Sequence, residues 1–160
     1  MNNTQIPEIV EELNATFKGE PWYGISLMEK LNQITVEEAV ASVPDYPKTI
    51  VKFVKHLLAW REFVIKKLEG EALFKIEMNT ESDWPAVEIK SDSDWKNLLS
   101  ELEASQRKIL ELLAHLSDDL LWANVPGENY NYRYMLRGLI EHDTYHLGQI
   151  SLLHSILKDS

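Results

Sequence analysis

The chain has 160 residues, a length that fits one domain, so we expect a single domain over residues 1–160. With 16 basic and 26 acidic residues its net charge is −10, and an acidic surface without a basic patch is a poor match for the phosphates of nucleic acid. The lack of cysteine excludes disulfides, thiolate metal ligands and a cysteine nucleophile.

The start of the chain and its hydropathy predict a soluble cytoplasmic protein. The first residues have neither the positive start nor the apolar core of a signal peptide. No run approaches the roughly 20 apolar residues of a membrane span. Lys52, Lys55, Lys66 and Lys67 are interleaved with apolar residues, and we interpret them as the solvent side of a helix. We therefore expect neither a nucleic-acid partner nor a membrane partner.

Apolar residues at three- and four-residue steps predict a first helix over residues 5–17. Gly19 and Pro21 interrupt this pattern, and Pro21 can open a second helical piece over residues 22–32. The sequence TVEE at 35–38 predicts a short capped turn before a loop.

A second long helix is predicted over residues 48–68, with Gly70 as its stop. The following segment, 71–94, has weak periodicity and predicts a long irregular connection. Connections of this length in a compact domain are often functional. We expect the segment either to cover a pocket or to form a dimer contact, with Trp84 as a packing anchor.

A broad leucine stripe predicts a third helix over residues 95–116, followed by a helical turn at 117–122. Asn129 or Asn131 is expected to cap a fourth helix that ends near Lys158. No strand is predicted. Four long helices predict an all-α helix bundle, in which metal sites are built from side chains that face inward from different helices.

Two histidines of the fourth helix are the most informative residues. His142 and His146 are four residues apart, so their rings lie on one face, and Leu139 and Leu153 mark that face as buried. Because each ring has polar nitrogens that need partners, the pair indicates either a metal site or hydrogen bonds within the core. Asp143 stands where the zinc-peptidase pattern HExxH has glutamate, which disfavours a peptidase.

His56, in the middle of the second helix, is the candidate for a third ligand, although a lone histidine there is more often a hydrogen-bonded core residue. Three imidazoles leave coordination positions open, as in catalytic zinc sites. Imidazole also suits nickel and iron. We interpret His115 and His154 as surface or partly buried structural histidines outside the site.

The run GLIEHDTYHLGQI at 138–150 resembles the last helix of the DinB/YfiT-like superfamily. The segments GEPWYG at 19–24 and HLLAWR at 56–61 and the order of elements resemble that family too, so the resemblance covers nearly the whole chain. It implies an up-down-down-up four-helix bundle that forms a homodimer. It also implies a divalent metal held by His56, His142 and His146. Some members are thiol-dependent transferases or isomerases that use bacillithiol, mycothiol or glutathione-like thiols, and others have no known substrate.

The first functional hypothesis is a metal-dependent enzyme of the thiol-transferase or hydrolase type. The metal, which we expect to be zinc, nickel or iron, would activate a bound water or a low-molecular-weight thiol against a small-molecule substrate. Gln149, and less favourably Asp143, are candidates to orient a ligating ring. Tyr145 and Trp60 are candidates either to line the pocket or to fill the core.

The alternative hypothesis is a non-enzymatic stress-response or interaction module with a structural or vestigial metal site. A bundle without metal is a third possibility, which the stacked histidines disfavour. The sequence leaves open whether Trp22, Trp84 and Trp122 lie in the core or in a dimer interface.

Overall fold

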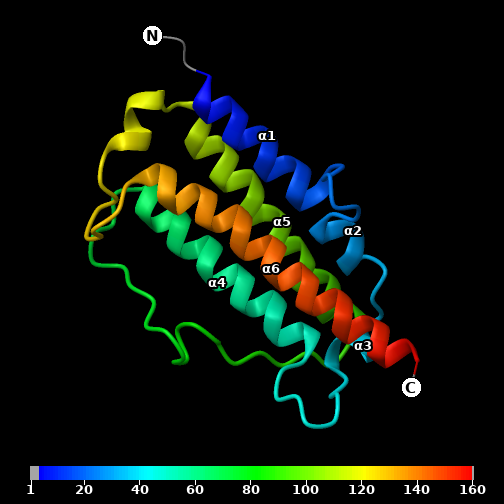
Figure 1. Cartoon of the computed structure of the whole chain (residues 1–160). Helices are drawn as coiled ribbons and strands as arrows, with labels where there is room; N and C mark the ends of the chain where they lie inside the picture. The colour runs from blue at the N-terminus through cyan, green and yellow to red at the C-terminus, as the bar shows by residue number, and fades with distance from the viewer. Residues whose placement is uncertain (1–3, 160) are drawn as a thin grey trace.

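The computed structural model describes residues 4–159, and over this range the chain is built from helices and loops, which confirms the expected all-α class (Figure 1). Shorter helices stand between the four long ones. The long helices are α1 (Gln5–Lys18), α4 (Ile50–Leu68), α5 (Asp92–Ala114) and α6 (Tyr132–Lys158). The short ones are α2 (Leu27–Leu31), α3 (Val36–Val40) and the 3-10 helix η1 (Asp118–Trp122).

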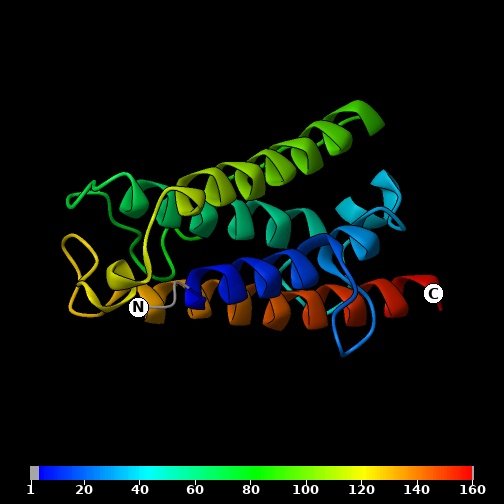
Figure 2. The same cartoon turned by 90° about the horizontal axis from the view of Figure 1, so that it is seen from above.

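The four long helices lie side by side around a common core (Figures 1 and 2). Helix α4 packs against α5 and α6, and α1 packs against the same two helices. Residues 69–91, between α4 and α5, run along the outside of α4 (Figure 1). No helix in the described range is both long and apolar enough to cross a bilayer.

Side-chain caps set where the last two long helices begin. Asn131 Oδ1 accepts the backbone N–H of Tyr134 at 2.9 Å, so Asn131 is the cap of α6 out of the two predicted candidates. Ser91 Oγ accepts the N–H of Asp94 at 3.2 Å, which starts α5 at Asp92, earlier than the predicted start at residue 95. The cap precedes the apolar stripe on which the prediction depended.

The predicted helical piece over 22–32 is wrong in its first half, because only Leu27–Leu31 is helical. Gly24 has a φ of 118°, and its N–H donates to the carbonyl of Pro21 at 3.0 Å, so the chain makes a turn there. The capped turn at 35–38 is confirmed, since Thr35 and Glu38 form a reciprocal capping box at the start of α3.

Helix α1 is capped by a residue more than 100 positions away in the sequence. Asp118 Oδ2 accepts the N–H groups of Thr4 and Gln5 at 2.8 and 2.9 Å, and its Oδ1 accepts that of Ile6 at 2.9 Å. These three donors are among those that the first turn of a helix leaves without partners. The hydrogen bonds hold the pKa of Asp118 below its ordinary value.

Lys67 departs from its expected place on the solvent side of α4. Its side chain is fully buried, and its Nζ lies 2.8 Å from the carbonyl oxygen of Pro126 and 3.1 Å from Glu128 Oε1. The loop before α6 thus folds over the end of α4 and supplies a half-buried counter-charge, which the helical pattern of α4 does not predict.

Two apolar clusters fill the core, one toward each end of the bundle. The first includes Phe53, Leu98 and Leu147, and the second includes Phe63, Ile109 and Met135. Between these positions on α4, α5 and α6 lie three buried polar residues, Arg61, Gln106 and Asp143. The middle of the bundle is therefore polar, and it is there that α4 and α6 bring their histidines together.

Candidate metal centre

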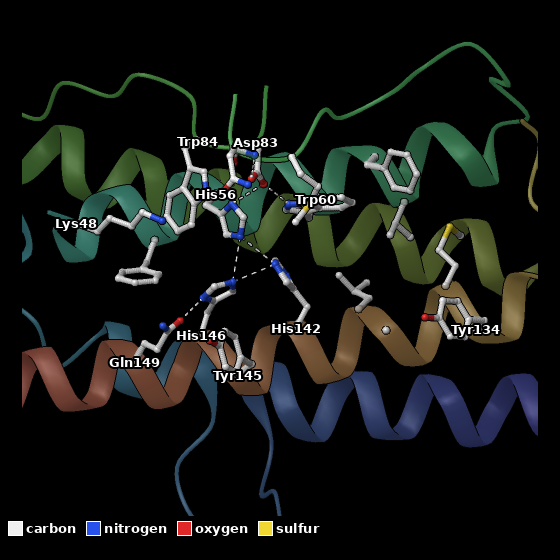
Figure 3. Close-up of a pocket in the computed structure, with 18 of the residues that line it drawn as sticks. Lys48, His56, Trp60, Asp83, Trp84, Tyr134, His142, Tyr145, His146 and Gln149 are labelled. Atoms are coloured by element: carbon white, nitrogen blue, oxygen red, sulfur yellow. Dashed lines mark hydrogen bonds and ion pairs between the residues drawn. The ribbon is translucent and has the colours of Figure 1, made fainter. Parts of the chain in front are cut away.

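His56 of α4 meets His142 and His146 of α6 in the interior of the bundle (Figure 3). The Nε2 atom of His56 lies 3.0 Å from that of His142 and 3.0 Å from that of His146. The third separation, between His142 and His146, is 3.1 Å. His56 and His146 are buried and His142 is half-buried. The three rings that sequence spacing suggested would meet therefore do converge, each through the same ring nitrogen.

The outward-facing nitrogens of two rings show which tautomer they adopt. His56 Nδ1 lies 2.7 Å from the carbonyl oxygen of Asp83, and His146 Nδ1 lies 2.6 Å from Gln149 Oε1. Both partners are acceptors, so each Nδ1 carries the proton. In a neutral imidazole the Nε2 atom then has a free lone pair. These two lone pairs face each other, and His142 has at most one proton to share between them. The cluster therefore has more acceptors than donors.

Protonation of the rings does not resolve this excess of acceptors. Burial, followed by the charge of the neighbouring histidines, lowers the pKa of His142 to about 3. Burial likewise lowers the pKa of His146 to about 4. It also lowers the pKa of His56, against the opposing effect of Asp83. At neutral pH all three rings are therefore neutral, the form in which imidazole binds a metal.

The spacing of the three nitrogens suits one cation. The three nitrogens lie 3.0–3.1 Å apart, so one ion could bind all three at the ~2.0–2.1 Å of zinc–imidazole bonds. Among the described residues the group that converges in this way contains these three histidines and no carboxylate. Such a donor set leaves at least one coordination position for another ligand.

A pocket of about 560 Å³ opens over the three rings, within the size range of small-molecule sites. Trp60 and Tyr145, the two aromatic residues considered from the sequence, both line it. Its full lining is Tyr46, Lys48, Phe53, His56, Trp60, Phe63, Val64, Met78, Asn79, Asp83, Trp84, Tyr130, Tyr134, Met135, Gly138, Leu139, His142, Tyr145, His146 and Gln149.

Two residues of the connection between α4 and α5 hold the ring of His56 in place. The Trp84 ring stacks on it, with centroids 3.9 Å apart and planes 7° from parallel. Asp83 presents its carbonyl to the ring, while its buried carboxylate accepts from Trp60 Nε1 and from the N–H of Asn79, each at 2.8 Å. Of the two roles expected for this connection, a contact with the pocket is present, because Met78, Asn79, Asp83 and Trp84 line it, and a dimer contact stays a prediction. Asp83 was not expected, because an acidic residue in a weakly periodic segment carries no signal of its own.

Of the two candidates to orient a ring, Gln149 does so and Asp143 does not. Asp143 forms a close buried ion pair with Arg61, whose other guanidinium nitrogen donates to Gln106 Oε1 at 2.8 Å. Adjacent residues on a helix face different directions, so Asp143 points to the interface with α5 while His142 points into the pocket.

The two histidines set outside the site do lie outside it, but they differ in burial. His115 is exposed, as expected. His154 is only 1% exposed, so its assignment to the surface or to partial burial is wrong. Its Nε2 lies 3.3 Å from Glu38 Oε2, because the short helix α3 folds back over the end of α6.

The tryptophans left open by the sequence also fall into two groups. Trp84 packs in the pocket on His56. Trp22 is completely exposed, and Trp122 is largely exposed.

Fold and site together define a helical protein with a three-histidine centre open to a pocket. A family model described as the DinB superfamily matches residues 26–150, which is most of the chain. The chain therefore belongs to the DinB superfamily, which confirms the resemblance; the motifs at 56–61 and 138–150 lie in the matched range, and the one at 19–24 lies outside it. Comparison with curated proteins and with solved structures finds no match.

Proposed function

We propose that this protein is a metal-dependent enzyme of the thiol-transferase or hydrolase type, with one divalent ion held by His56, His142 and His146. The observation that carries the proposal is the convergence of their Nε2 atoms at 3.0–3.1 Å with too few protons to join them. Zinc, nickel and iron are all compatible with imidazole ligands. When bound, such an ion supplies Lewis acidity, which lowers the pKa of a water or a low-molecular-weight thiol so that a nucleophile exists at neutral pH.

The residues around the rings prepare the site for this role. Asp83 and Gln149 keep the Nδ1 protons of His56 and His146 in place, so that Nε2 is the donor atom in each case. Trp84 covers one face of His56 and restricts rotation of the ring. The pocket lining is largely apolar, and electrostatic interactions are stronger in surroundings of low dielectric constant.

We also propose that residues 1–160 form one up-down-down-up bundle. Opposite directions for α4 and α6 are supported by two ring contacts in reverse order along the helices: Phe53 with His146 and Trp60 with His142. A parallel arrangement of α1 and α6 is supported by the Glu12–Arg137 ion pair and by the shared apolar cluster of Phe17 and Leu147.

A homodimer is part of the proposal. Trp22, Tyr145 and Leu152 are large side chains that are 101%, 65% and 63% exposed. Tyr145 and Leu152 lie two helical turns apart on α6, so they share one face of that helix, which supports a contact between two copies there. Analytical ultracentrifugation measures the mass directly, and a monomer at high micromolar concentration would contradict this part.

Elemental analysis of protein purified without a histidine tag tests the metal site. The wild type is expected to hold about one ion per chain, and His56→Ala, His142→Ala and His146→Ala are each expected to lose it. His115→Ala is the matched control, because this histidine is exposed and outside the cluster. A cluster variant that keeps its full metal content removes that residue from the ligand set.

A screen for reaction tests the enzymatic part. The metal-loaded protein is incubated with small thiols together with electrophiles, and separately with hydrolysable esters. Consumption of either that disappears in His142→Ala supports the proposal. A full metal content with no consumption favours the alternative, an interaction module in which the metal is structural.

A further inference from the structure

The pocket extends to both sides of the three histidines (Figure 3). Helices α4 and α6 pass each other in opposite directions there, since Phe53 lies against His146 and Trp60 against His142, with ring centroids 5.4 and 5.9 Å apart. One end of the pocket therefore contains residues that precede Phe53 and follow His146. The other end contains residues that follow Trp60 and precede His142.

The end beyond Trp60 is lined by apolar and aromatic side chains from both helices and from two loops. We call this end the apolar chamber: Phe63, Val64, Met78, Tyr130, Tyr134, Met135, Gly138 and Leu139. Burial raises the pKa of Tyr130 to about 12, so its phenol is neutral. A chamber without a charge and with this lining favours an apolar group.

Gly138 gives the chamber its depth next to the histidines. It precedes His142 by one helical turn and faces the same way. A Cβ placed on it meets no atom within 4 Å, so the packing of the protein does not require glycine here. Glycine is unfavourable inside a helix. A side chain at this position would fill part of the pocket directly beside the candidate metal centre.

The opposite end carries a cation. Lys48 is half-buried, and its Nζ lies 3.3 Å from the centroid of the Trp84 ring, which stacks on His56. Figure 3 shows Lys48 and Tyr134 at opposite ends of the pocket, with the histidines between them. Within the described part of the chain Lys48 has no carboxylate at ion-pair distance, although several exposed lysines do. The charge of Asp83 acts on Lys48 from farther away, and that carboxylate already accepts hydrogen bonds from Trp60 and Asn79. A partly desolvated ammonium group with no direct ion-pair partner favours an anion from outside.

We propose that the pocket takes an elongated organic anion, with its negative group at Lys48, its centre over the three histidines, and an aliphatic or aromatic arm in the apolar chamber over Gly138. This rests on the proposed function, to which it adds the chemical class of the substrate: a small carboxylate or other acid that carries an apolar arm.

Two fluorescent probes separate the arm from the charge. The first is anilinonaphthalene sulfonate, which has both, and the second is the neutral N-phenylnaphthylamine, which has the arm alone. Their dissociation constants are measured by fluorescence titration at fixed ionic strength, with protein as purified. Neither probe needs to ligate the metal, so the result does not depend on the proposed reaction.

Gly138→Leu is expected to raise the dissociation constants of both probes tenfold or more, because the leucine side chain fills the apolar chamber. Gly148→Leu is the matched control. Gly148 lies in the same helix with open space around it, but it is exposed and does not line the pocket. The dissociation constants of this variant are expected to stay within twofold of those of the wild type. Gly138→Ala gives a smaller loss in the same direction and decides the matter if the leucine variant does not fold.

Lys48→Gln is expected to weaken binding of the sulfonate probe several-fold and to leave binding of the neutral amine unchanged. Lys52→Gln is its control, because Lys52 is exposed on α4 and outside the pocket lining. Equal losses for Gly138→Leu and Gly148→Leu, equal effects of Lys48→Gln on both probes, or no saturable binding to the wild type would overturn the proposal. The metal content is measured in the same samples. It separates failure of this proposal from failure of the proposed function, because a wild type that binds no metal would contradict the proposed function alone.

Discussion

Two buried polar clusters lie next to each other in this bundle, and they are built on opposite principles. In one, Arg61 and Asp143 form an ion pair at 0% and 1% exposure, and Gln106 accepts a further hydrogen bond from Arg61. In the other, His56, His142 and His146 direct neutral ring nitrogens at one another.

The difference shows which cluster the chain itself balances in charge, although Arg61 Nε and Asp143 Oδ1 have no hydrogen-bond partner among the described residues. Burial raises the pKa of Asp143, and the positive charge of Arg61 opposes that rise, so both halves of a charge pair come from the chain itself. The histidine cluster contains acceptors without a matching donor or cation. A buried polar group without a partner is unfavourable, so an ion bound by this cluster would stabilise it. The predictions below test the two sides of this contrast, and the last one gives a reference outside both clusters.

Removing one half of the Arg61–Asp143 ion pair is expected to have the largest effect. Arg61→Ala leaves Asp143 buried without its counter-charge, which lowers the free energy of unfolding by about 3–5 kcal/mol. Urea denaturation monitored by circular dichroism measures the loss. The metal content of the folded fraction is expected to stay close to that of the wild type, because the hydrogen bonds of Arg61 go to Gln106 and Asp143 and not to the three histidines.

The double variant Arg61→Met with Asp143→Leu is the control for this prediction. It replaces the pair with apolar side chains of similar length, a change that is often neutral in other proteins. It is therefore expected to recover most of the lost stability. A single Arg61→Ala variant as stable as the wild type would show that the pair contributes nothing to the fold.

Adding metal to the cluster of three histidines is expected to stabilise the protein. At a free-ion concentration 100 times the dissociation constant, binding to the folded state alone adds about 2.7 kcal/mol. Differential scanning fluorimetry of chelator-treated and zinc-loaded protein measures the shift in Tm. His146→Ala is expected to show no shift, while Arg61→Met keeps it. A shift of equal size in His146→Ala would place the stabilising ion elsewhere.

Gln149 orients a ring of the histidine cluster, and its substitution is expected to have a smaller effect than the changes above. Gln149→Leu removes the acceptor of the His146 Nδ1 proton, which should weaken metal binding by about 10–100-fold. Competition with a chromophoric chelator gives the affinity. Gln149→Glu keeps an acceptor at the same position and is expected to restore most of it, so equal losses in both variants would argue against an orienting role.

Asp118, far from both clusters, gives a reference for an ordinary polar group whose partners are all backbone N–H groups. Asp118→Asn is expected to lower Tm at neutral pH. The pKa of Asp118 is held below its ordinary value of 3.8, so its carboxylate stabilises the folded state above that value, and the contribution disappears as pH falls through the folded-state pKa. The difference in Tm between wild type and variant should therefore be full at pH 6 and narrow below about pH 4. A difference that persists unchanged at low pH would mean that the charge is not responsible.

Local pattern was sufficient for much of the fold and for the three histidines. The positions of helices α1, α4, α5 and α6 follow from apolar residues at helical spacing. The pair His142 and His146 is readable because a helix repeats every 3.6 residues. His56 was selectable because it lies inside a second apolar pattern, on a helix that a bundle must pack against the first.

What local pattern missed has a common physical origin. Lys67 and His154 are buried by segments that fold back over them from elsewhere in the chain, which the periodicity of their own helices does not reveal. Trp84 and Asp83 reach His56 from an irregular connection, where no period fixes the direction of a side chain.

The sequence by itself determined the helical class, the family and the choice of three imidazoles, because these depend on residue types at short spacings within each helix. Only the tertiary structure decided which nitrogen of each ring faces inward, which neighbours hold it there, and that a pocket opens on both sides. Those features arise from contacts between residues far apart in the chain, whose energies depend on how whole helices and loops pack.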